Sequence, residues 1–338
     1  MANGAVENLY VHFPFCRARC SYCSLYSRAG RPESERNDYA LKVADSIATL
    51  GVHHGGFKTV YFGGGTPALC DLKPVFSALK LMRNAEFTVE LHPLDVTKDF
   101  LETLKEGGVN RISMGVQSLD DDILAHMGRG YTFAEAERAF AKVKSVFDNA
   151  GIDLIVGYPG EKGAILPQHV RLADWGLRHC SVYSLQNERR LENAIDDETT
   201  LNRISETAEF LHGMGLVRYE ISNYAVHGYE CRHNLAVWRG EDYLGIGDGA
   251  CGRIGRRRTR NFGGLSPFEE TVSEEFDEKE RRLFRLRTIE GLDASGHPEW
   301  RKPLDRFVEE GMLTRSGEVY RLTARGTEVC DSILSELA

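Results

Sequence analysis

The chain has 338 residues, of which 42% are hydrophobic and 27% are charged, a composition typical of a globular protein rather than a disordered one. Its formal net charge of −8 argues against broad nucleic-acid binding, and we expect no nucleic-acid partner. No stretch approaches the roughly 18 uninterrupted apolar residues that mark a membrane-spanning helix.

Several features bear on the compartment in which the protein works. Residues 1–4 lack both the basic region and the apolar region of a signal peptide. The cysteines outside residues 16–23 are scattered, without the spacing of a secreted disulfide framework. We therefore expect a soluble, cytoplasmic protein. These scattered cysteines are Cys70, Cys180, Cys231, Cys251 and Cys330.

Short β-rich runs alternate with longer amphipathic stretches over residues 1–215. The expected strands cover residues 9–13, 59–62, 87–91, 111–116, 153–156 and 181–185. The clearest helical stretches between them are residues 39–50, 132–147 and 201–214. Six such units predict an α/β fold with an incomplete (β/α)6 barrel of the TIM type, in which polar residues at the C-terminal strand ends line one mouth.

The rest of the chain follows a different rhythm. Residues 216–276 are rich in glycine and are expected to form an extension. Within them, the basic run at residues 253–260 is interpreted as a salt-bridged strand or loop. Residues 277–338 combine a helix-like stretch with a turn-strand pattern at 313–322, which predicts a small winged-helix-like domain. Its acidic flanks favour a packing or partner role over DNA binding.

Three cysteines, Cys16, Cys20 and Cys23, follow the first expected strand in a C-x₃-C-x₂-C spacing. Three thiolates on one short loop can hold three irons of a [4Fe–4S] cluster and leave the fourth iron open to another ligand. Structural zinc is the main alternative. It needs four closed ligands, and neither His12 nor the distant Cys70 offers a recognisable paired spacing.

A second motif, Gly63-Gly64-Gly65-Thr66-Pro67, directly follows the second expected strand. Glycine lets the backbone approach a ligand closely and present N–H groups to an anion. A tight turn without a ligand is the alternative for the motif taken alone.

The cysteine spacing resembles that of the radical S-adenosylmethionine (SAM) superfamily, in which SAM occupies the open iron. Residues 10–16 and 20–23 are similar to one branch of it, the oxygen-independent coproporphyrinogen III oxidases and the heme chaperones (HemW). The resemblance covers nearly all of the chain. It implies a radical SAM barrel with Cys16, Cys20 and Cys23 as ligands of a [4Fe–4S] cluster.

The resemblance also implies a set of residues around bound SAM. Gly64, Gly65 and Thr66 belong to the segment that holds the SAM amino group in the family. Acid and amide side chains suit the ribose hydroxyls and the amino group, whereas arginine suits the carboxylate. The other positions carried over are Tyr10, Tyr22, Glu90, Gln117, Arg129, Asp153 and Gln186. Two departures from the family pattern, His92 and Glu161, are expected to adjust neighbouring contacts.

Residues 219–240 resemble the HemW signature, which includes His233-Asn-Leu-x-x-Trp238. The resemblance implies His233 as a heme ligand, with Trp238 and Tyr224 covering the macrocycle, and a neutral imidazole suits that role. A structural hydrogen-bonding role is the alternative for His233. Cys251 stands where family members carry histidine, and we interpret it as a buried, inert thiol, with a heme or redox ligand as the alternative.

Two features favour the chaperone branch: Leu25 replaces a further cysteine of the oxidases, and only nine residues precede Tyr10. We therefore expect a HemW-like heme chaperone that binds a [4Fe–4S] cluster, SAM and heme and delivers heme to recipient proteins. An oxygen-independent coproporphyrinogen III oxidase-type enzyme acting on a porphyrinogen is the alternative, and radical SAM chemistry in anaerobic heme degradation is a third.

The partners expected on this basis are heme or porphyrin, recipient heme proteins and an electron donor for the cluster. Contact with a membrane is expected only through the recipients. Whether the chain forms a homodimer, and whether SAM is cleaved or only bound, stay open.

Overall fold

The computed structural model describes residues 6–51, 55–161, 170–185, 191–193, 195–261 and 268–338. Its largest element is a nine-stranded sheet in the order β11-β1-β4-β5-β6-β7-β8-β10-β9. Six parallel neighbours form the centre of this sheet, and they confirm the six predicted strands and the incomplete barrel. They are β1 (Asn8–Phe13), β4 (Phe57–Gly64), β5 (Leu81–Leu91), β6 (Arg111–Gln117), β7 (Ala150–Val156) and β8 (His179–Ser184).

Three further strands extend the sheet at its two edges. β11 (Leu244–Ile246) pairs in parallel with β1, whereas β10 (Asn223–Ala225) pairs antiparallel with β8 and with β9 (Val217–Arg218). All three come from residues 216–276, so the segment predicted as an extension contributes to the barrel sheet itself. The same segment also forms the small antiparallel sheet of β12 (Cys251–Ile254), β13 (Arg257–Arg260) and β14 (Phe268–Thr271).

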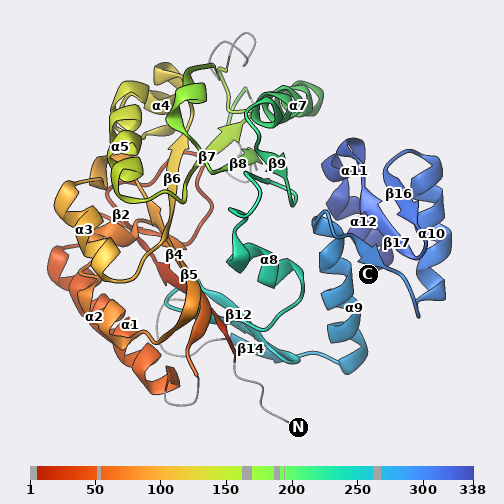
Figure 1. Cartoon of the computed structure of the whole chain (residues 1–338), viewed down its shortest axis with the longest axis horizontal. Coiled ribbons are helices and arrows are strands. Elements are labelled where there is room, and N and C mark those ends of the chain that lie inside the picture. Colours follow the sequence, from red (N-terminus) through yellow and green to blue (C-terminus); the bar gives the residue numbers. More distant parts are fainter. Residues whose placement is uncertain (1–5, 52–54, 162–169, 186–190, 194, 262–267) are drawn as a thin grey trace.

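Helices cover the outer side of the parallel strands (Figure 1). They are α1 (Glu33–Gly51), α2 (Lys73–Ala78), α3 (Lys98–Glu106), α4 (Asp121–Met127), α5 (Phe133–Val146) and α7 (Asp197–Gly213), with α8 (Arg232–Trp238) near the other side of the sheet. Helix α5 begins at a capping box between Thr132 and Glu135, which satisfies the first backbone N–H groups. None of the helices described is both long and apolar enough to cross a membrane.

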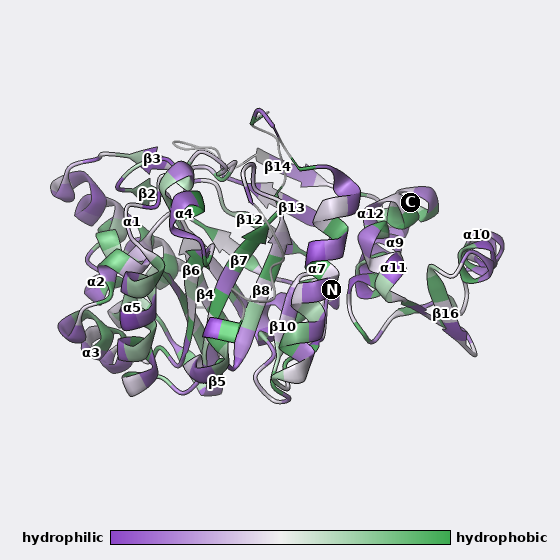
Figure 2. Ribbon diagram, turned by 90° about the horizontal axis from the view of Figure 1, so that it is seen from above, coloured by the Kyte–Doolittle hydropathy of each residue, from purple (hydrophilic) through white to green (hydrophobic). Residues whose placement is uncertain are grey.

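The hydrophobic core lies between the helices and the sheet. Its residues include Val11, Phe62, Val89, Ile112 and Ile152, which are buried on successive strands. Figure 2 shows hydrophobic colour on the strands inside the barrel and hydrophilic stretches on the outer helices. Parallel strands covered on both faces are typically this apolar, which explains the near-continuous runs that predict them.

The C-terminal residues pack around a second core that includes Leu286, Trp300, Tyr320 and Ile333. The elements are α9 (Glu274–Phe284), β15 (Leu292–Asp293), α10 (Pro298–Glu309), β16 (Leu313–Ser316), β17 (Val319–Leu322), α11 (Ala324–Glu328) and α12 (Cys330–Leu337). The three strands pair antiparallel in the order β15-β17-β16. The predicted helix and turn-strand pattern are therefore both present in this small unit, which lies beside α7 and α8 in Figure 1.

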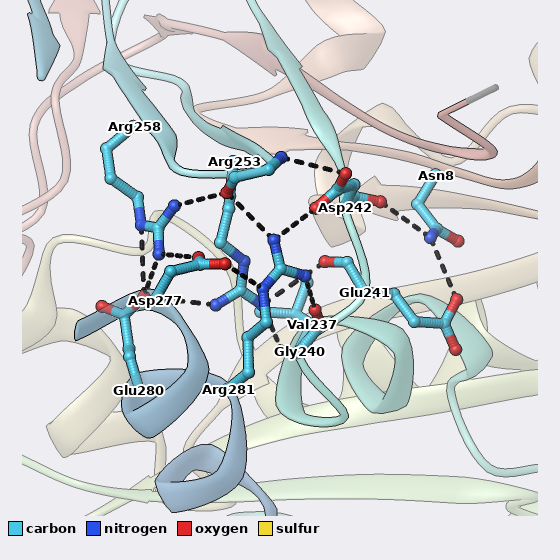
Figure 3. A network of polar contacts seen from close by, with 11 residues as sticks. Asn8, Val237, Gly240, Glu241, Asp242, Arg253, Arg258, Asp277, Glu280 and Arg281 are labelled. Atoms are coloured by element: carbon cyan, nitrogen blue, oxygen red, sulfur yellow. Dashed lines mark hydrogen bonds and ion pairs between the residues drawn. The ribbon is translucent and has the colours of Figure 1, made fainter. Parts of the chain in front are cut away.

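Arginines of the basic run join this unit to the barrel (Figure 3). Arg258 Nη2 lies 2.6 Å from Asp277 Oδ1 and 2.5 Å from Glu280 Oε2, both on α9. Arg253, whose side chain is only 3% exposed, also contacts Glu280 at 3.4 Å. The prediction of a salt-bridged strand is confirmed, and the half-buried ion pairs hold α9 against the β12-β13 hairpin.

Candidate functional site

A cavity of about 1200 Å³ lies at the C-terminal ends of the parallel strands. Residues predicted from the family resemblance come together on its wall, from the cysteine loop, from β4 to β7 at or near their C-terminal ends, and from the segment after α4. They are Cys16, Cys20, Tyr22, Cys23, Gly64, Gly65, Thr66, Glu90, Gln117, Arg129 and Asp153. Gln186 lies outside the described residues. The cavity reaches α8 and the C-terminal unit, where Asn234, Trp238 and Arg287 line it.

The glycine turn after β4 packs directly on the cysteine loop. The backbone N–H of Gly65 donates to Phe13 O at 2.7 Å, and that of Thr66 donates to Phe15 O at 2.7 Å. A Cβ atom on Gly65 would lie 2.9 Å from Cys16 Sγ and 2.5 Å from Phe15 O. Only glycine fits this contact without a shift of the loop, so the motif positions the first cysteine.

The cysteine thiols form a donor set suited to iron. Burial raises the pKa of Cys16 to about 11, with smaller contributions from Cys23 and Cys20, so this thiol is protonated at neutral pH until metal displaces its proton. No further cysteine among the described residues lines the cavity. Nor do any three His, Cys, Asp or Glu side chains in the described ranges converge closely enough to hold a single metal ion.

Arg129 places a buried cation beside the cysteine loop. Its Nη1 donates to Tyr22 OH at 3.2 Å and lies 3.5 Å from Cys20 Sγ. Its Nη2 donates to Gly115 O at 2.8 Å, and its Nε donates to Tyr131 OH at 3.0 Å. The guanidinium is therefore held from two sides, and it has no carboxylate partner among the described residues. Such a group suits a carboxylate ligand.

Gln117 ends β6 in an unusual backbone conformation. Its φ is +70°, and the pairing of β6 with β7 shifts register between Gly115 and Gln117. A Cβ atom on Gly115 would lie 2.6 Å from Gln117 Nε2, so the amide folds back over its own strand. Positive φ at a non-glycine residue costs free energy and is concentrated at functional sites, where a bulge redirects a side chain.

Two half-buried carboxyl groups on the cavity wall, Glu90 on β5 and Asp153 on β7, lie close enough for Asp153 to act electrostatically on Glu90. Burial, together with Asp153, raises the pKa of Glu90 to about 7. Glu90 accepts hydrogen bonds from Tyr61 OH at 2.8 Å and from Gly64 N at 3.2 Å. Burial also raises the pKa of Asp153, which accepts from Ser113 Oγ at 3.0 Å. Glu90 therefore changes charge near neutral pH.

Tyr10 and His233 do not line the cavity but lie next to Tyr61, which does. The ring centroid of His233 is 5.4 Å from that of Tyr61 and 6.4 Å from that of Tyr10. Tyr10 OH is hydrogen-bonded to His12 Nδ1 at 3.0 Å. His233 is 4% exposed, and burial lowers its pKa to about 3, so its imidazole is neutral.

One expectation is wrong: Cys251 is exposed rather than buried. It begins β12, where Gly252 and Arg253 are buried and Cys251 and Ile254 face outwards. The two central residues of β12, Gly252 and Arg253, pack against the rest of the protein, and Cys251 at the start of the strand stays exposed to solvent.

The two departures from the family pattern support local turns. His92 Nδ1 accepts from Leu94 N at 3.3 Å after β5. Glu161 accepts from Gly157 N at 3.1 Å and from Arg203 Nη1 at 2.6 Å, which ties the turn after β7 to α7.

The sequence patterns do not predict three residues that contact the site. Tyr61 on β4 lines the cavity, Thr59 on the same strand lies 2.9 Å from His233 Nδ1, and Tyr131 OH accepts from Arg129 Nε. Because side chains alternate along a strand, Thr59 and Tyr61 share the face that carries Gly63 of the glycine motif, and that periodicity could have identified them. Tyr131 lies two residues after Arg129, and its OH donates to Val116 O at 2.9 Å. Nothing in the sequence distinguishes Tyr131 from a packing aromatic.

Comparison with known proteins identifies relatives over the whole chain. A family model described as "Radical SAM superfamily" matches residues 10–173. The heme chaperone HemW of Bacillus subtilis is 30% identical, over 98% of this chain and 100% of its own length. The heme chaperone HemW of Escherichia coli is 31% identical, over 97% of both chains.

A solved structure shares the fold. Coproporphyrinogen III oxidase (HemN) from Escherichia coli, described as a radical SAM enzyme, superposes with a TM-score of 0.84. The superposition covers 99% of this chain and 91% of that structure, at 20% sequence identity. At that identity the match speaks for the architecture alone, including the C-terminal unit.

The packing of Gly65 predicts the effect of one methyl group. We expect Gly65→Ala to bind less than half the iron and sulfide of the natural chain after anaerobic reconstitution, because its Cβ displaces Cys16 or Phe15. Gly213→Ala is the matched control, since a Cβ there meets nothing within 4 Å. Equal iron and sulfide in Gly65→Ala and the control would contradict the positioning role.

Proposed function

The chain belongs to the HemW family of the radical SAM superfamily, and on this premise we propose that it is a cytoplasmic heme chaperone. The observation that carries the proposal is a single cavity whose wall includes both the cysteine loop and residues of α8, Asn234 and Trp238. Its volume of about 1200 Å³ exceeds the range of roughly 300–1,000 Å³ typical of a pocket for one small ligand. This leaves room for a second ligand beside SAM.

The family implies a [4Fe–4S] cluster and SAM, and the residues at the cysteine end fit both. Cys16, Cys20 and Cys23 supply three thiols on one wall, which leaves the fourth iron position for SAM. A cluster held by these thiols would supply redox chemistry, the transfer of an electron to SAM, which the proposed carrier function does not require. The chain's own contribution is to fix the thiols through the glycine turn and to surround SAM with polar groups.

Four residues, here called the SAM cradle, are proposed to contact different groups of SAM: Glu90, Gln117, Arg129 and Asp153. Arg129 suits the SAM carboxylate because its guanidinium is buried and already oriented by Tyr131. Glu90 and Asp153 offer acceptors to the amino group and the ribose hydroxyls, and Gln117 offers an amide. Tyr61 orients Glu90 by donating its hydroxyl proton.

The α8 end of the cavity suits a flat, partly apolar ligand with carboxylates. Arg287 Cζ lies 5.1 Å from the centroid of the Trp238 ring, so an aromatic face and a cation stand together. Two buried polar atoms on this wall, Arg287 Nε and Asn223 Oδ1, have no hydrogen-bond partner among the described residues. Heme combines an aromatic macrocycle, which the Trp238 ring can stack on, with propionates, to which the Arg287 guanidinium can donate.

His233 is the proposed axial ligand, because it is neutral and lies on the first turn of α8 next to Tyr61. Heme iron reaches this imidazole only when the Tyr61 side chain moves aside, since His233 is buried and Tyr61 lies between it and the cavity. Such a movement would couple loading and release of heme to the position of the Tyr61 ring. Recipient heme proteins and an electron donor for the cluster are the partners proposed with this function.

A porphyrinogen-oxidising enzyme is the second candidate. The observation that favours it is the set of polar residues beside the cysteine loop. An enzyme that cleaves SAM needs all of these contacts to orient it, whereas a carrier that only binds SAM needs fewer.

Heme titration tests the chaperone proposal. Anaerobically reconstituted protein is expected to bind about one heme per chain, and the binding should saturate. In His233→Ala the Soret band should change and the affinity for heme should be at least tenfold lower than in the natural chain. His227→Ala is the control, because the His227 side chain is fully exposed and lies beside Glu230 at the surface, 3.5 Å from its carboxylate. Absent heme binding, or binding that is equal in both variants, would contradict the proposal and favour the porphyrinogen enzyme.

The raised pKa of Glu90 predicts how SAM binding depends on pH. The carboxyl is neutral below about pH 7 in the free protein, and donors on SAM require its ionised form. Affinity for SAM should therefore rise about tenfold per unit as pH approaches about 7 and level off above it. Glu90→Gln should bind more weakly and without this slope in calorimetric titrations. A natural chain whose SAM affinity is flat between about pH 6 and 8 would refute the role of Glu90.

A further inference from the structure

A chain of buried hydrogen bonds ends on His233. Asn8, Thr59 and His233 are 2%, 0% and 4% exposed, so water does not compete for their polar atoms. The Thr59 hydroxyl lies 2.8 Å from Asn8 Oδ1 and 2.9 Å from His233 Nδ1. The direction of these two bonds decides which nitrogen of His233 carries the proton.

The orientation of the Asn8 amide is fixed by its other neighbours. Asn8 Nδ2 lies 3.0 Å from the backbone oxygen of Asp242 and 3.3 Å from Glu241 Oε2 (Figure 3). A backbone carbonyl is only an acceptor, so the amide nitrogen must face it. The amide oxygen of Asn8 therefore faces Thr59.

The Thr59 hydroxyl contacts two neighbours but carries a single proton. Thr59 has one hydroxyl proton, and Asn8 Oδ1 can only accept, so Thr59 donates to Asn8. The second contact of the hydroxyl must then be a bond that it accepts, which requires a proton on His233 Nδ1. A neutral imidazole protonated at Nδ1 carries its lone pair on Nε2. No described residue hydrogen-bonds that atom.

We propose that Asn8 and Thr59 are positioning residues that hold His233 in the Nδ1–H tautomer and keep Nε2 available for iron. The proposal rests on the proposed function for its purpose, although the tautomer itself follows from the hydrogen bonds alone. Histidines that bind metal usually donate their other N–H to a protein acceptor, which fixes the ring and raises its basicity. Thr59 supplies that acceptor in this fold.

The two ends of this hydrogen-bond series, Asn8 and His233, are anchored by different parts of the molecule. Arg281 on α9 donates from Nη2 to Asp242 Oδ1 at 2.7 Å, so the C-terminal unit fixes the turn that orients Asn8. Gly240 allows this approach, because a Cβ there would lie 2.8 Å from Arg281 Cβ. At the other end, Glu86 on β5 accepts from His233 N at 3.0 Å and fixes the first turn of α8.

The tautomer can be measured without heme. In long-range ¹H–¹⁵N spectra of the apoprotein labelled at histidine, the His233 signals are identified by their loss in His233→Asn. We expect the natural chain to show a protonated Nδ1 and an unprotonated Nε2 at neutral pH. A protonated Nε2 in the natural chain would overturn the proposal outright.

Two substitutions at Thr59 separate hydrogen bonding from packing. Thr59→Val keeps the shape but removes the hydroxyl, so His233 should lose the fixed tautomer and show both forms. Thr59→Ser keeps the hydroxyl and should restore the Nδ1–H signature. A folded Thr59→Val that retains the natural tautomer would show that another group sets it and would contradict the proposal. If Thr59→Val fails to fold, Asn8→Ala takes its place. Without Asn8 Oδ1 as acceptor, Thr59 can donate to His233 Nδ1, so the form protonated at Nε2 should appear.

Heme titration of the same variants separates this inference from the proposed function. With both correct, heme affinity falls at least fivefold in Thr59→Val and recovers in Thr59→Ser. Loss of heme binding in the natural chain would sink the chaperone function while leaving the tautomer result intact. Conversely, heme binding that is equal in Thr59→Val and Thr59→Ser would show that the tautomer has no positioning role for heme.

Discussion

Close contact between the glycine turn after β4 and the end of β1 determines where the chemistry of this molecule lies. Backbone hydrogen bonds from Gly65 and Thr66 reach Phe13 and Phe15 at 2.7 Å, and the space at Gly65 admits no Cβ. The cysteine loop follows directly from Phe15, so its first thiol is placed by that contact rather than by its own sequence. Everything else in the cradle is arranged around the same strand ends, as in other parallel α/β barrels.

Burial of polar groups at these strand ends costs free energy, which the surrounding hydrogen bonds offset only in part. The raised pKa of Glu90 is a sign of that cost, and the positive φ of Gln117 adds backbone strain at the same strand ends. The structure tolerates them because the outer helices and the sheet form an extensive apolar core. A binding site whose groups are already desolvated and oriented loses less free energy when a polar ligand enters.

The sequence predicts the six parallel strands and the small C-terminal unit because periodicity and apolar runs are local properties. It also indicates the cysteine loop and most of the cradle, through motif spacing and family resemblance. It does not show that residues 217–246 complete both edges of the sheet, since those pairings join positions far apart in the chain. The exposure of Cys251 and the hydrogen bond from Thr59 to Asn8 depend on tertiary contacts in the same way.

The most direct test of the account asks whether heme moves without consumption of SAM. Protein loaded with cluster, SAM and heme is mixed under anaerobic, reducing conditions with an excess of an apo b-type cytochrome, and holo-cytochrome and 5′-deoxyadenosine are quantified together. The account predicts transfer of most of the heme with far less than one 5′-deoxyadenosine per heme. Retained heme, together with stoichiometric SAM cleavage when a porphyrinogen is supplied, would contradict it and identify an enzyme instead of a carrier.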